Sequence, residues 1–449
     1  MIGMKFKFKF SDLFLEIATV FVIILSIVLW IFIMTSDQRF SHINQTQPVR
    51  QQAKTRNSKS LYDLYIPTNA YGFVDGKLYR LYDSKNNLPF EFSKELQNIK
   101  VENKIKKVSS DRESYENTLN NPDLIQLSYP DEITFGLLTK FKMKKGNREF
   151  NRIFIPKTNK WLYLGNDQNT SLYRVSLKKA NFNTLRHYVK IAKNKEAVDF
   201  VRLKSGYSAF YVKSENWNVY SYLTSTQSDS YFVSRLLGTS GVTSRTNKNG
   251  RTTYSYNYYT RLRVPKTGEN NHHDYLYTHY EKAKVPTMTN QLFDSVYYVH
   301  RLGLTEQDLR FFDADKNSVR YTNYIEGIPV FLNDHDLQVD TKFSSDSVTI
   351  SFNSTNFQIP IPFDGQTETL ESTYDMISDL SKHGLHQSEI ERIMVGFKVE
   401  SDKSHNNLVN LVPTYYIKAF GQWKSKSEWL KEDIKLYQKL EENTENEVK

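Results

Sequence analysis

The sequence contains no cysteine among its 449 residues. The fold therefore cannot depend on disulfide bonds, which excludes a small disulfide-stabilised scaffold. An exported chain of this kind is typical of bacteria whose extracytoplasmic proteins avoid cysteine. About 390 residues follow the first 60, which is enough to bury the hydrophobic core of two or three domains.

The sequence also lacks the motifs that identify common enzymes. We find no Gly-x-Ser-x-Gly, His-Glu-x-x-His or P-loop pattern, and the absence of cysteine excludes a thiol nucleophile. Residues 176–179 fit Ser-x-x-Lys, but the Ser-Asp-Asn and Lys-Thr-Gly elements that complete that set do not follow. We therefore expect a protein that is not an enzyme, with no catalytic residue and no cofactor.

The formal net charge is +10, and we interpret the positive charge as spread along the chain. Nucleic acid is not an expected partner outside the cell. An anionic membrane surface or a cell-wall polymer is compatible with this charge, although the charge also serves solubility.

Four polar residues lie close together: His272, His273, Asp274 and His279. On a strand, His273 and His279 share one face, an arrangement that a metal ion could use. Because the cluster belongs to one hairpin, we interpret it as a solvated strand with a polar turn, and we predict no metal site.

A single long apolar run is present, residues 17–34, which read IATVFVIILSIVLWIFIM and contain no charge. Such a helix is ~27 Å long, enough to cross the hydrocarbon core of a bilayer. The run lacks a small-residue cleavage site, so we predict an uncleaved transmembrane helix over residues 13–34. Lys5, Lys7 and Lys9 precede it, which favours a cytoplasmic N-terminus and an extracytoplasmic bulk.

One face of this helix carries its polar side chains in a heptad-like stripe. Membrane helices recognise each other through close packing and hydrogen bonds rather than through hydrophobic burial. The predicted helix–helix contacts are Glu16, Thr19, Ile23, Ser26, Trp30 and Ile33. Two of these residues have an alternative role: Glu16 could extend toward Lys9 at the cytoplasmic boundary, and Trp30 could be an anchor at the outer interface.

A polar stretch over residues 35–60 is predicted to form a stalk. Beyond it, residues 70–82 alternate around Asp75-Gly76, which indicates a two-residue β-hairpin. Further elements expected before residue 200 are strands over 123–130, 132–143, 150–156 and 160–165, and a helix over 181–193.

Three later helices, over residues 228–238, 290–303 and 367–384, each precede a group of strands. This order predicts α+β domains with antiparallel sheets and packed helices. In the third helix one apolar face is expected, with Gly384 as the C-terminal stop; the residues of that face are Leu370, Tyr374, Ile377 and Leu380.

We predict seven segments along the chain. The end of the chain is expected to be a frayed helix followed by disorder. The segments are a cytoplasmic tail (1–12), the transmembrane helix (13–34), the stalk (35–60), an N-terminal domain (61–200), a central domain (201–285), a C-terminal domain (286–432) and an acidic tail (433–449).

Four blocks of the sequence resemble the YycH family of Gram-positive membrane proteins. Two lie in the C-terminal third, VRYTNYIEGIPVF (319–331) and ERIMVGFKVES…LVNLVPTYYIKAFGQW (391–423). The other two, YFVSRLLG…TTYSYNYYTRLRV (231–264) and YIPTNAYGFVDGKLYRLY (65–82), follow the order typical of that family. Together with the chain length and the N-terminal anchor, the resemblance spans nearly the whole chain.

The resemblance implies an accessory regulator of the essential WalK (YycG) sensor histidine kinase, which controls cell-wall metabolism. It implies three partners: a WalK-type kinase, a YycI-type membrane protein and the lipid bilayer, which the transmembrane helix spans below a three-domain ectodomain. The family offers no catalytic motif. The alternative is an extracytoplasmic binding module for cell-wall polymer or another ligand, with the helix as a simple anchor.

Overall fold

The structure is a computed structural model. It describes residues 19, 22–28, 61–82, 87–138, 148–266, 275–304, 307–332, 336–361, 365–402, 405 and 407–448.

The chain divides into two compact units, Met1–Arg56 and Asn57–Lys449. In the first unit, residue 19 and residues 22–28 are helical and exposed. Among the described residues, no helix has both the length and the apolar character needed to cross a membrane. Most of the membrane helix predicted over residues 13–34 lies outside the described residues.

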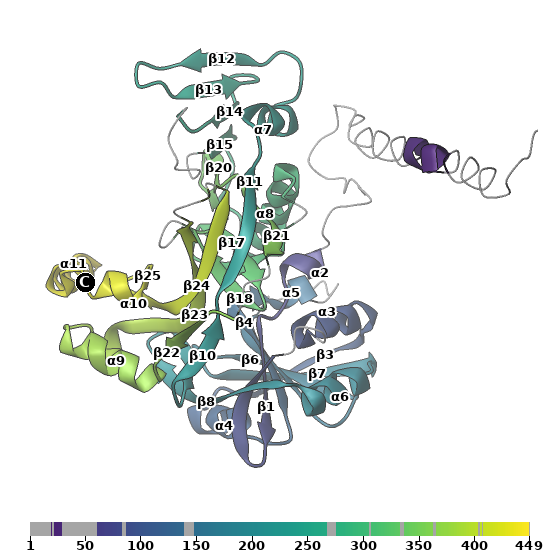
Figure 1. Ribbon diagram of the computed structural model, residues 1–449. Helices are drawn as coiled ribbons and strands as arrows, with labels where there is room; N and C mark the ends of the chain where they lie inside the picture. Colours follow the sequence, from purple (N-terminus) through teal and green to yellow (C-terminus); the bar gives the residue numbers. More distant parts are fainter. Residues whose placement is uncertain are drawn as a thin grey trace, which may run out of the picture. The chain divides into compact units, whose positions relative to one another are not determined.

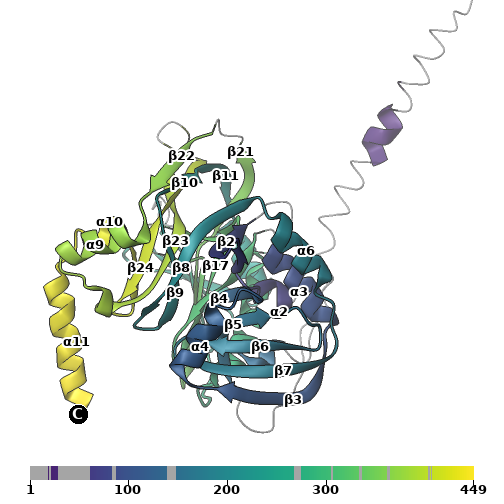
Figure 2. The ribbon, with the colours of Figure 1, turned by 90° about the horizontal axis from the view of Figure 1, so that it is seen from below.

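The second unit begins with a nine-stranded antiparallel sheet, drawn in the lower part of Figure 1 and from below in Figure 2. Its strands lie in the order β3-β7-β6-β5-β4-β1-β2-β8-β9. Their bounds are β1 Asn69–Val74, β2 Lys77–Tyr82, β3 Lys100–Ser109, β4 Ile125–Thr134, β5 Glu149–Ile155, β6 Trp161–Asn166, β7 Ser171–Lys179, β8 Asn194–Leu203 and β9 Gly206–Tyr211.

The predicted hairpin around Asp75-Gly76 is confirmed. Strands β1 and β2 pair up to Val74↔Lys77, which leaves a two-residue loop between them. Both loop residues have positive φ, 51° for Asp75 and 76° for Gly76, as the favoured two-residue hairpin turn requires.

The strand predicted over residues 132–143 is wrong over Phe135–Leu138, and its last five residues lie outside the described residues. Strand β4 continues through Pro130, because a register shift in its pairing with β5 accommodates a residue that cannot donate to the ladder. The chain then forms the short helix α5 Phe135–Leu138. Phe135 and Leu137 are both buried. Burial of every second residue is also compatible with a strand, so the sequence pattern alone did not distinguish a strand from this helical turn.

The rest of the second unit builds a long sheet of mostly antiparallel strands. Its path is β12-β13-β14-β15-β20-β19-β17-β18-β23-β24-β11-β21, with β16 on β17 and β25 on β24, and β10 pairs separately with β22. A single parallel pair, β18 with β23, occurs among its described pairings.

The bounds of these strands are β10 Glu215–Asn218, β11 Tyr220–Thr226, β12 Thr243–Thr246, β13 Thr252–Ser255, β14 Thr260–Arg263, β15 Tyr275–Tyr280, β16 Leu309–Ala314, β17 Ser318–Ile325, β18 Ile328–Phe331, β19 Val339–Phe343, β20 Ser347–Phe352, β21 Thr355–Ile361, β22 Thr367–Leu370, β23 Ile390–Ser401, β24 Leu408–Ala419 and β25 Gln422–Ser425.

Helices cover these sheets. Ser228 caps α7 and Ser372 caps α9, each through its hydroxyl group. The helices are α2 Leu61–Leu64, α3 Leu88–Asn98, α4 Arg112–Leu119, α5, α6 Asn183–Ile191, α7 Asp229–Leu236, α8 Met288–Leu302, α9 Thr373–Lys382, the 3-10 turn Gln387–Glu389, α10 Lys426–Trp429 and α11 Ile434–Val448.

The third long helix is shorter than predicted. Its first residues instead form strand β22, so Leu370 pairs with Glu215 of β10 and lies outside the helix. Helix α9 begins after Ser372, and Tyr374 on it is 44% exposed. The helix buries Thr373, Met376, Ile377 and Leu380.

Gly384 has φ 103° just after α9, as the predicted helix stop requires.

The end of the chain differs from the expectation. The expected disordered end is helical, because α11 continues to Val448.

The predicted domain boundaries stay predictions. The first, at residue 200, falls within β8, and the second, at residue 285, falls between β15 and α8. Two large hydrophobic clusters extend across them. One cluster joins Phe150 of β5 to Phe352 of β20, and the other joins Phe210 of β9 to Phe397 of β23.

Candidate functional site

The structure describes three of the six predicted helix–helix contacts. Thr19, Ile23 and Ser26 are helical and exposed, and their spacing of four and three residues puts them on one side of the helix. Glu16, Trp30 and Ile33 lie outside the described residues. The stripe stays a prediction.

The residues that follow the predicted stalk are buried at once. Helix α2 makes a single turn, closed by a hydrogen bond from the Tyr65 amide to the Leu61 carbonyl (3.1 Å). Leu64, Tyr65 and Ile66 are at most 3% exposed. The chain then enters β1, which pairs with β4 in the middle of the nine-stranded sheet. We call Leu61–Ile66 and the residues that enclose them the stalk junction.

The Tyr65 side chain ends in a buried cluster of hydroxyl groups. Its hydroxyl donates to the Leu292 carbonyl of α8 (2.7 Å) and lies 2.7 Å from the Tyr321 hydroxyl of β17. Ser295 of α8 completes the cluster, 2.6 Å from the Tyr321 hydroxyl and 3.1 Å from the Leu292 carbonyl. Burial and the neighbouring Tyr321 raise the pKa of Tyr65 well above its ordinary value, so its hydroxyl is a permanent donor.

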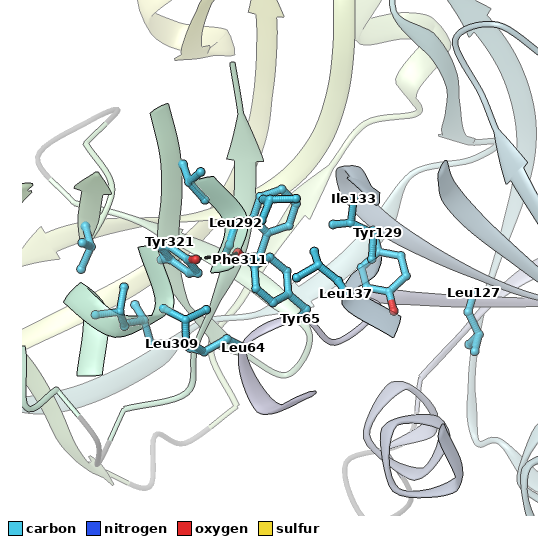
Figure 3. Packing of buried hydrophobic residues seen from close by; sticks show 14 of the residues in the cluster. Leu64, Tyr65, Leu127, Tyr129, Ile133, Leu137, Leu292, Leu309, Phe311 and Tyr321 are labelled. Atoms are coloured by element: carbon cyan, nitrogen blue, oxygen red, sulfur yellow. Dashed lines mark hydrogen bonds between the residues drawn. The ribbon is translucent and has the colours of Figure 1, made fainter. Parts of the chain in front are cut away.

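Apolar side chains from both parts of the second unit enclose Tyr65. Its ring packs against Phe311 of β16 and Tyr321, with centroids 5.3 and 6.2 Å apart. Figure 3 shows Leu137 and Ile133, from the nine-stranded sheet and its helix α5, on the other side of the ring. The junction is therefore shared by the nine-stranded sheet and by the layer of α8, β16 and β17.

A buried ion pair holds these two parts together beside the junction. Arg392 of β23 donates to the Asp131 carboxylate and to the Pro130 carbonyl, both on β4. Asp131 also accepts a hydrogen bond from the Ala314 amide of β16 (3.1 Å). The Thr289 hydroxyl of α8 donates a hydrogen bond to the Thr134 hydroxyl of β4 (3.0 Å). This pairing of charge and backbone fixes the position of β4 against β16 and β23.

A second ion cluster lies on the β16 side. Asp313 is 1% exposed and accepts hydrogen bonds from Arg320 (2.9 Å), Lys418 (3.2 Å) and the Trp423 indole (3.0 Å). Burial alone raises the pKa of Asp313, but Lys418 and Arg320 outweigh it and lower the pKa to about 2. The carboxylate is therefore ionised in every physiological condition and ties β16 to β17, β24 and β25.

Glu132 is a carboxyl group beside the junction whose pKa is shifted upward, opposite to that of Asp313. Burial, followed by the negative charges of Asp131 and Glu149, raises its pKa to about 7. One of its oxygens is buried without a hydrogen-bond partner. A charge that changes near neutral pH therefore lies next to the Asp131–Arg392 pair.

The predicted histidine cluster is described only in part, because His272, His273 and Asp274 lie outside the described residues. His279 lies 3.1 Å from the Thr260 hydroxyl and 3.9 Å from Glu281. Among the residues that the structure describes, no group of three or more potential metal ligands is found.

Sequence reasoning missed the residues of the junction. Tyr65 stands in a short run of apolar and aromatic residues, 61–66, between a polar stretch and Pro67, and the change in composition was the only local signal. Asp131, Asp313 and Arg392 gave no such signal, since their partners are more than 100 residues away in most cases and charge alone does not indicate burial.

Taken together, the mostly antiparallel sheets with shared cores define an α+β protein whose chain enters its core at the stalk junction. Residues 208–433 match the family model described as YycH protein, C-terminal domain. Since the match covers half of the chain, the chain belongs to the YycH family.

A solved structure agrees with this assignment. The chain is similar to the crystal structure of YycH from Bacillus subtilis, with a TM-score of 0.67 over 82% of this chain and 97% of that one. The sequence identity is 15%, so this likeness concerns the fold alone. No curated protein matches this sequence at a significant level.

Proposed function

We propose that this chain is a non-enzymatic regulator of a WalK (YycG)-type sensor histidine kinase that controls cell-wall metabolism. Its N-terminal helix spans the membrane with the N-terminus in the cytoplasm, and contacts the helices of the kinase and of a YycI-type protein. The extracytoplasmic region modulates these contacts. Membership in the YycH family supports the regulatory role.

The observation that carries the proposal is the burial of the stalk junction. Complete burial of a large apolar side chain contributes about 1.5–3 kcal/mol, so releasing Leu64, Tyr65 and Ile66 together would cost roughly 5–9 kcal/mol. Regulatory couplings are typically about 1–3 kcal/mol. The junction therefore stays closed during signalling, and a small shift of its two sides is passed to the chain that leaves Leu61.

The stripe on the N-terminal helix supplies the other end of this route. Hydrogen bonds between membrane helices average about 0.6 kcal/mol each, so Thr19 and Ser26 together with close packing reach the coupling range above. The contact is thus strong enough to bias a kinase and weak enough to be reversed.

The test reconstitutes the kinase with the full chain in vesicles and measures kinase autophosphorylation. Replacing residues 17–34 with polyleucine keeps the anchor but removes the stripe, and we expect it to abolish the effect on the kinase. Thr19→Leu with Ser26→Leu should weaken the effect several-fold. The matched control is Ile24→Leu with Val28→Leu, which changes the opposite side of the helix. Full regulation by the polyleucine variant would contradict the proposal.

A second candidate is an extracytoplasmic binding module with the helix as a simple anchor. The observation that favours it is the exposed basic sheet face formed by β12, β13 and β14, far along the chain from the stalk junction. The two candidates are compatible, since a ligand on the folded region can be the cue that the helix transmits.

A further inference from the structure

One basic stretch of the chain, residues 230–268, lies far from the stalk junction in the sequence. It contains seven Lys and Arg residues and no Asp or Glu, as residues 168–195 also do. Its described part builds α7 and strands β12 to β14, at one end of the long sheet (Figure 1).

Strand pairing collects the cations on one face of the sheet. On β14, Arg261 and Arg263 are exposed and alternate with the buried Leu262. The register places Thr253 of β13 opposite Arg263, and Arg245 of β12 opposite Thr253. Arg245 and Arg263 are therefore two strands apart, roughly 10 Å, and Arg261 and Arg263 are roughly 7 Å apart along one strand.

Hydroxyl side chains fill the positions between these cations. On the same face, β19 contributes Lys342 and Asp340, and Asp340 is paired with Arg320 of β17 at the far edge. We call this surface the basic face. Its hydroxyl residues are Thr243, Thr253, Ser255, Thr278, Thr349 and Ser351.

A packed core lies behind β14, β15 and β20, whereas all four residues of β12 are exposed. Phe232 of α7 packs against Tyr275 and Phe352, with ring centroids 4.9 and 4.8 Å apart. Arg301 of α8 donates to the Tyr277 hydroxyl (3.3 Å). The core therefore supports from behind the part of the basic face that carries Arg261 and Arg263.

We propose that the basic face binds an extended polyanion whose charges are phosphodiesters linked by polyol units. Arginine forms paired hydrogen bonds to phosphate oxygens, and the hydroxyl groups between the arginines can donate to phosphate or accept from a polyol. Arg261 and Arg263, roughly 7 Å apart, can contact neighbouring phosphates of an extended chain, and Arg245, roughly 10 Å from Arg263, can contact a further one.

A membrane surface fits the basic face less well. Proteins that lie on anionic lipid combine cations with apolar side chains that insert below the headgroups. On the face, Leu276 is only half-buried and lies beside Arg263, and the Tyr280 ring is covered in part by Arg261, 5.3 Å from its centroid. The exposed Tyr258 and Tyr259 lie at the turn between β13 and β14 and offer rings for contact with a polyol chain.

The hollow next to the face is not the site. It is an open depression of about 940 Å³ whose polar lining includes Lys282 and Lys284 but also Glu281 and Asp346. Its two acids balance its two lysines, so it offers a polyanion no net attraction.

The test measures binding of the full chain, held in phosphatidylcholine nanodiscs, to fluorescent poly(glycerol phosphate). We expect affinity that falls as salt is raised, because ion pairs with phosphate release counterions. Arg261→Glu with Arg263→Glu should weaken binding at least tenfold. The control, Lys106→Glu with Lys107→Glu on β3, makes the same change in net charge on the other sheet and should leave binding within twofold.

Arg261→Lys with Arg263→Lys keeps the charge and removes the paired donors, and we expect an intermediate loss. Equal losses in the Arg261/Arg263 and Lys106/Lys107 charge reversals would overturn the proposal, since the attraction would then be unspecific. So would absence of binding by the natural chain. Flotation with phosphatidylglycerol vesicles is the third arm, and binding there without binding to the polymer would assign the face to a membrane instead.

Polymer binding and vesicle flotation are both measured without the kinase. Loss of polymer binding with intact kinase regulation would leave the proposed function standing, and the reverse result would leave the basic face standing.

Discussion

The stalk junction and the basic face differ in how they place polar groups. At the junction, hydroxyls and carboxylates are buried, and each has partners from several distant strands or helices. On the basic face, the cations stand exposed on a sheet whose stability comes from the apolar residues behind it. A substitution at the junction should therefore change folding and coupling together, whereas one on the face should change binding alone.

The largest effect is expected from Asp313→Ala. Removing the carboxylate leaves Arg320 and Lys418 without their buried partner, and breaking a buried pair in this way costs about 3–5 kcal/mol. Unfolding of the full chain in mild detergent, followed by tryptophan fluorescence, measures the loss. The control is Asp315→Ala, whose carboxylate is 48% exposed and also contacts Arg320, with an expected cost below about 1 kcal/mol. Equal costs would show that burial does not distinguish the two sites.

A pH dependence of stability follows from Glu132. Its folded pKa, about 7, lies above the ordinary value of 4.5, so the folded state binds the proton more tightly than the unfolded state. Stability is therefore lost as the pH rises from about 4.5 through 7, by on the order of 2–3 kcal/mol for this group. Glu132→Gln should remove this component of the profile. An unchanged profile in the variant would assign the dependence to other groups.

A smaller effect is expected from Tyr65→Phe, which keeps the ring and removes one buried hydroxyl. The Leu292 carbonyl retains Ser295 as a donor, so the loss is about 1–2 kcal/mol. Ser295→Ala should cost a similar amount. Because both belong to one hydroxyl cluster, the double variant should differ from the sum of the single variants. Simple additivity in the unfolding midpoints would argue that the cluster is not a unit.

The smallest effect on stability is expected on the basic face. Arg261→Glu with Arg263→Glu changes exposed side chains and should shift the free energy of unfolding by less than about 0.5 kcal/mol. The same unfolding assay serves as the check. A loss of several kcal/mol would mean that these arginines have a structural role, and the sharp distinction between the two regions would not hold.

Local signals in the sequence predicted much of the fold. The Asp75-Gly76 turn, the helices over 181–193 and 290–303 and the antiparallel α+β architecture follow from turn chemistry and hydrophobic periodicity. The errors lie where a tertiary partner overrides the local pattern. Thr367–Leu370 became a strand because β10 offers an edge to pair with.

The functional regions were harder to predict, for the same reason. Tyr65 and Tyr321 are 256 residues apart, and Asp131 and Arg392 are 261 apart, so no local pattern connects them. The basic face was hidden for another reason. Its charge excess is visible in the sequence, but only the pairing of β12, β13 and β14 shows that Arg245, Arg261 and Arg263 share one face.

Kinase autophosphorylation in vesicles tests whether the stalk junction couples the folded region to the N-terminal helix. The comparison is between the natural chain and Tyr65→Phe, at equal amounts of folded protein inserted in the vesicles. We expect that Tyr65→Phe, although folded, changes the effect on the kinase several-fold, and that Ser295→Ala changes it in the same direction. Regulation identical to that of the natural chain in both variants would contradict coupling through the junction.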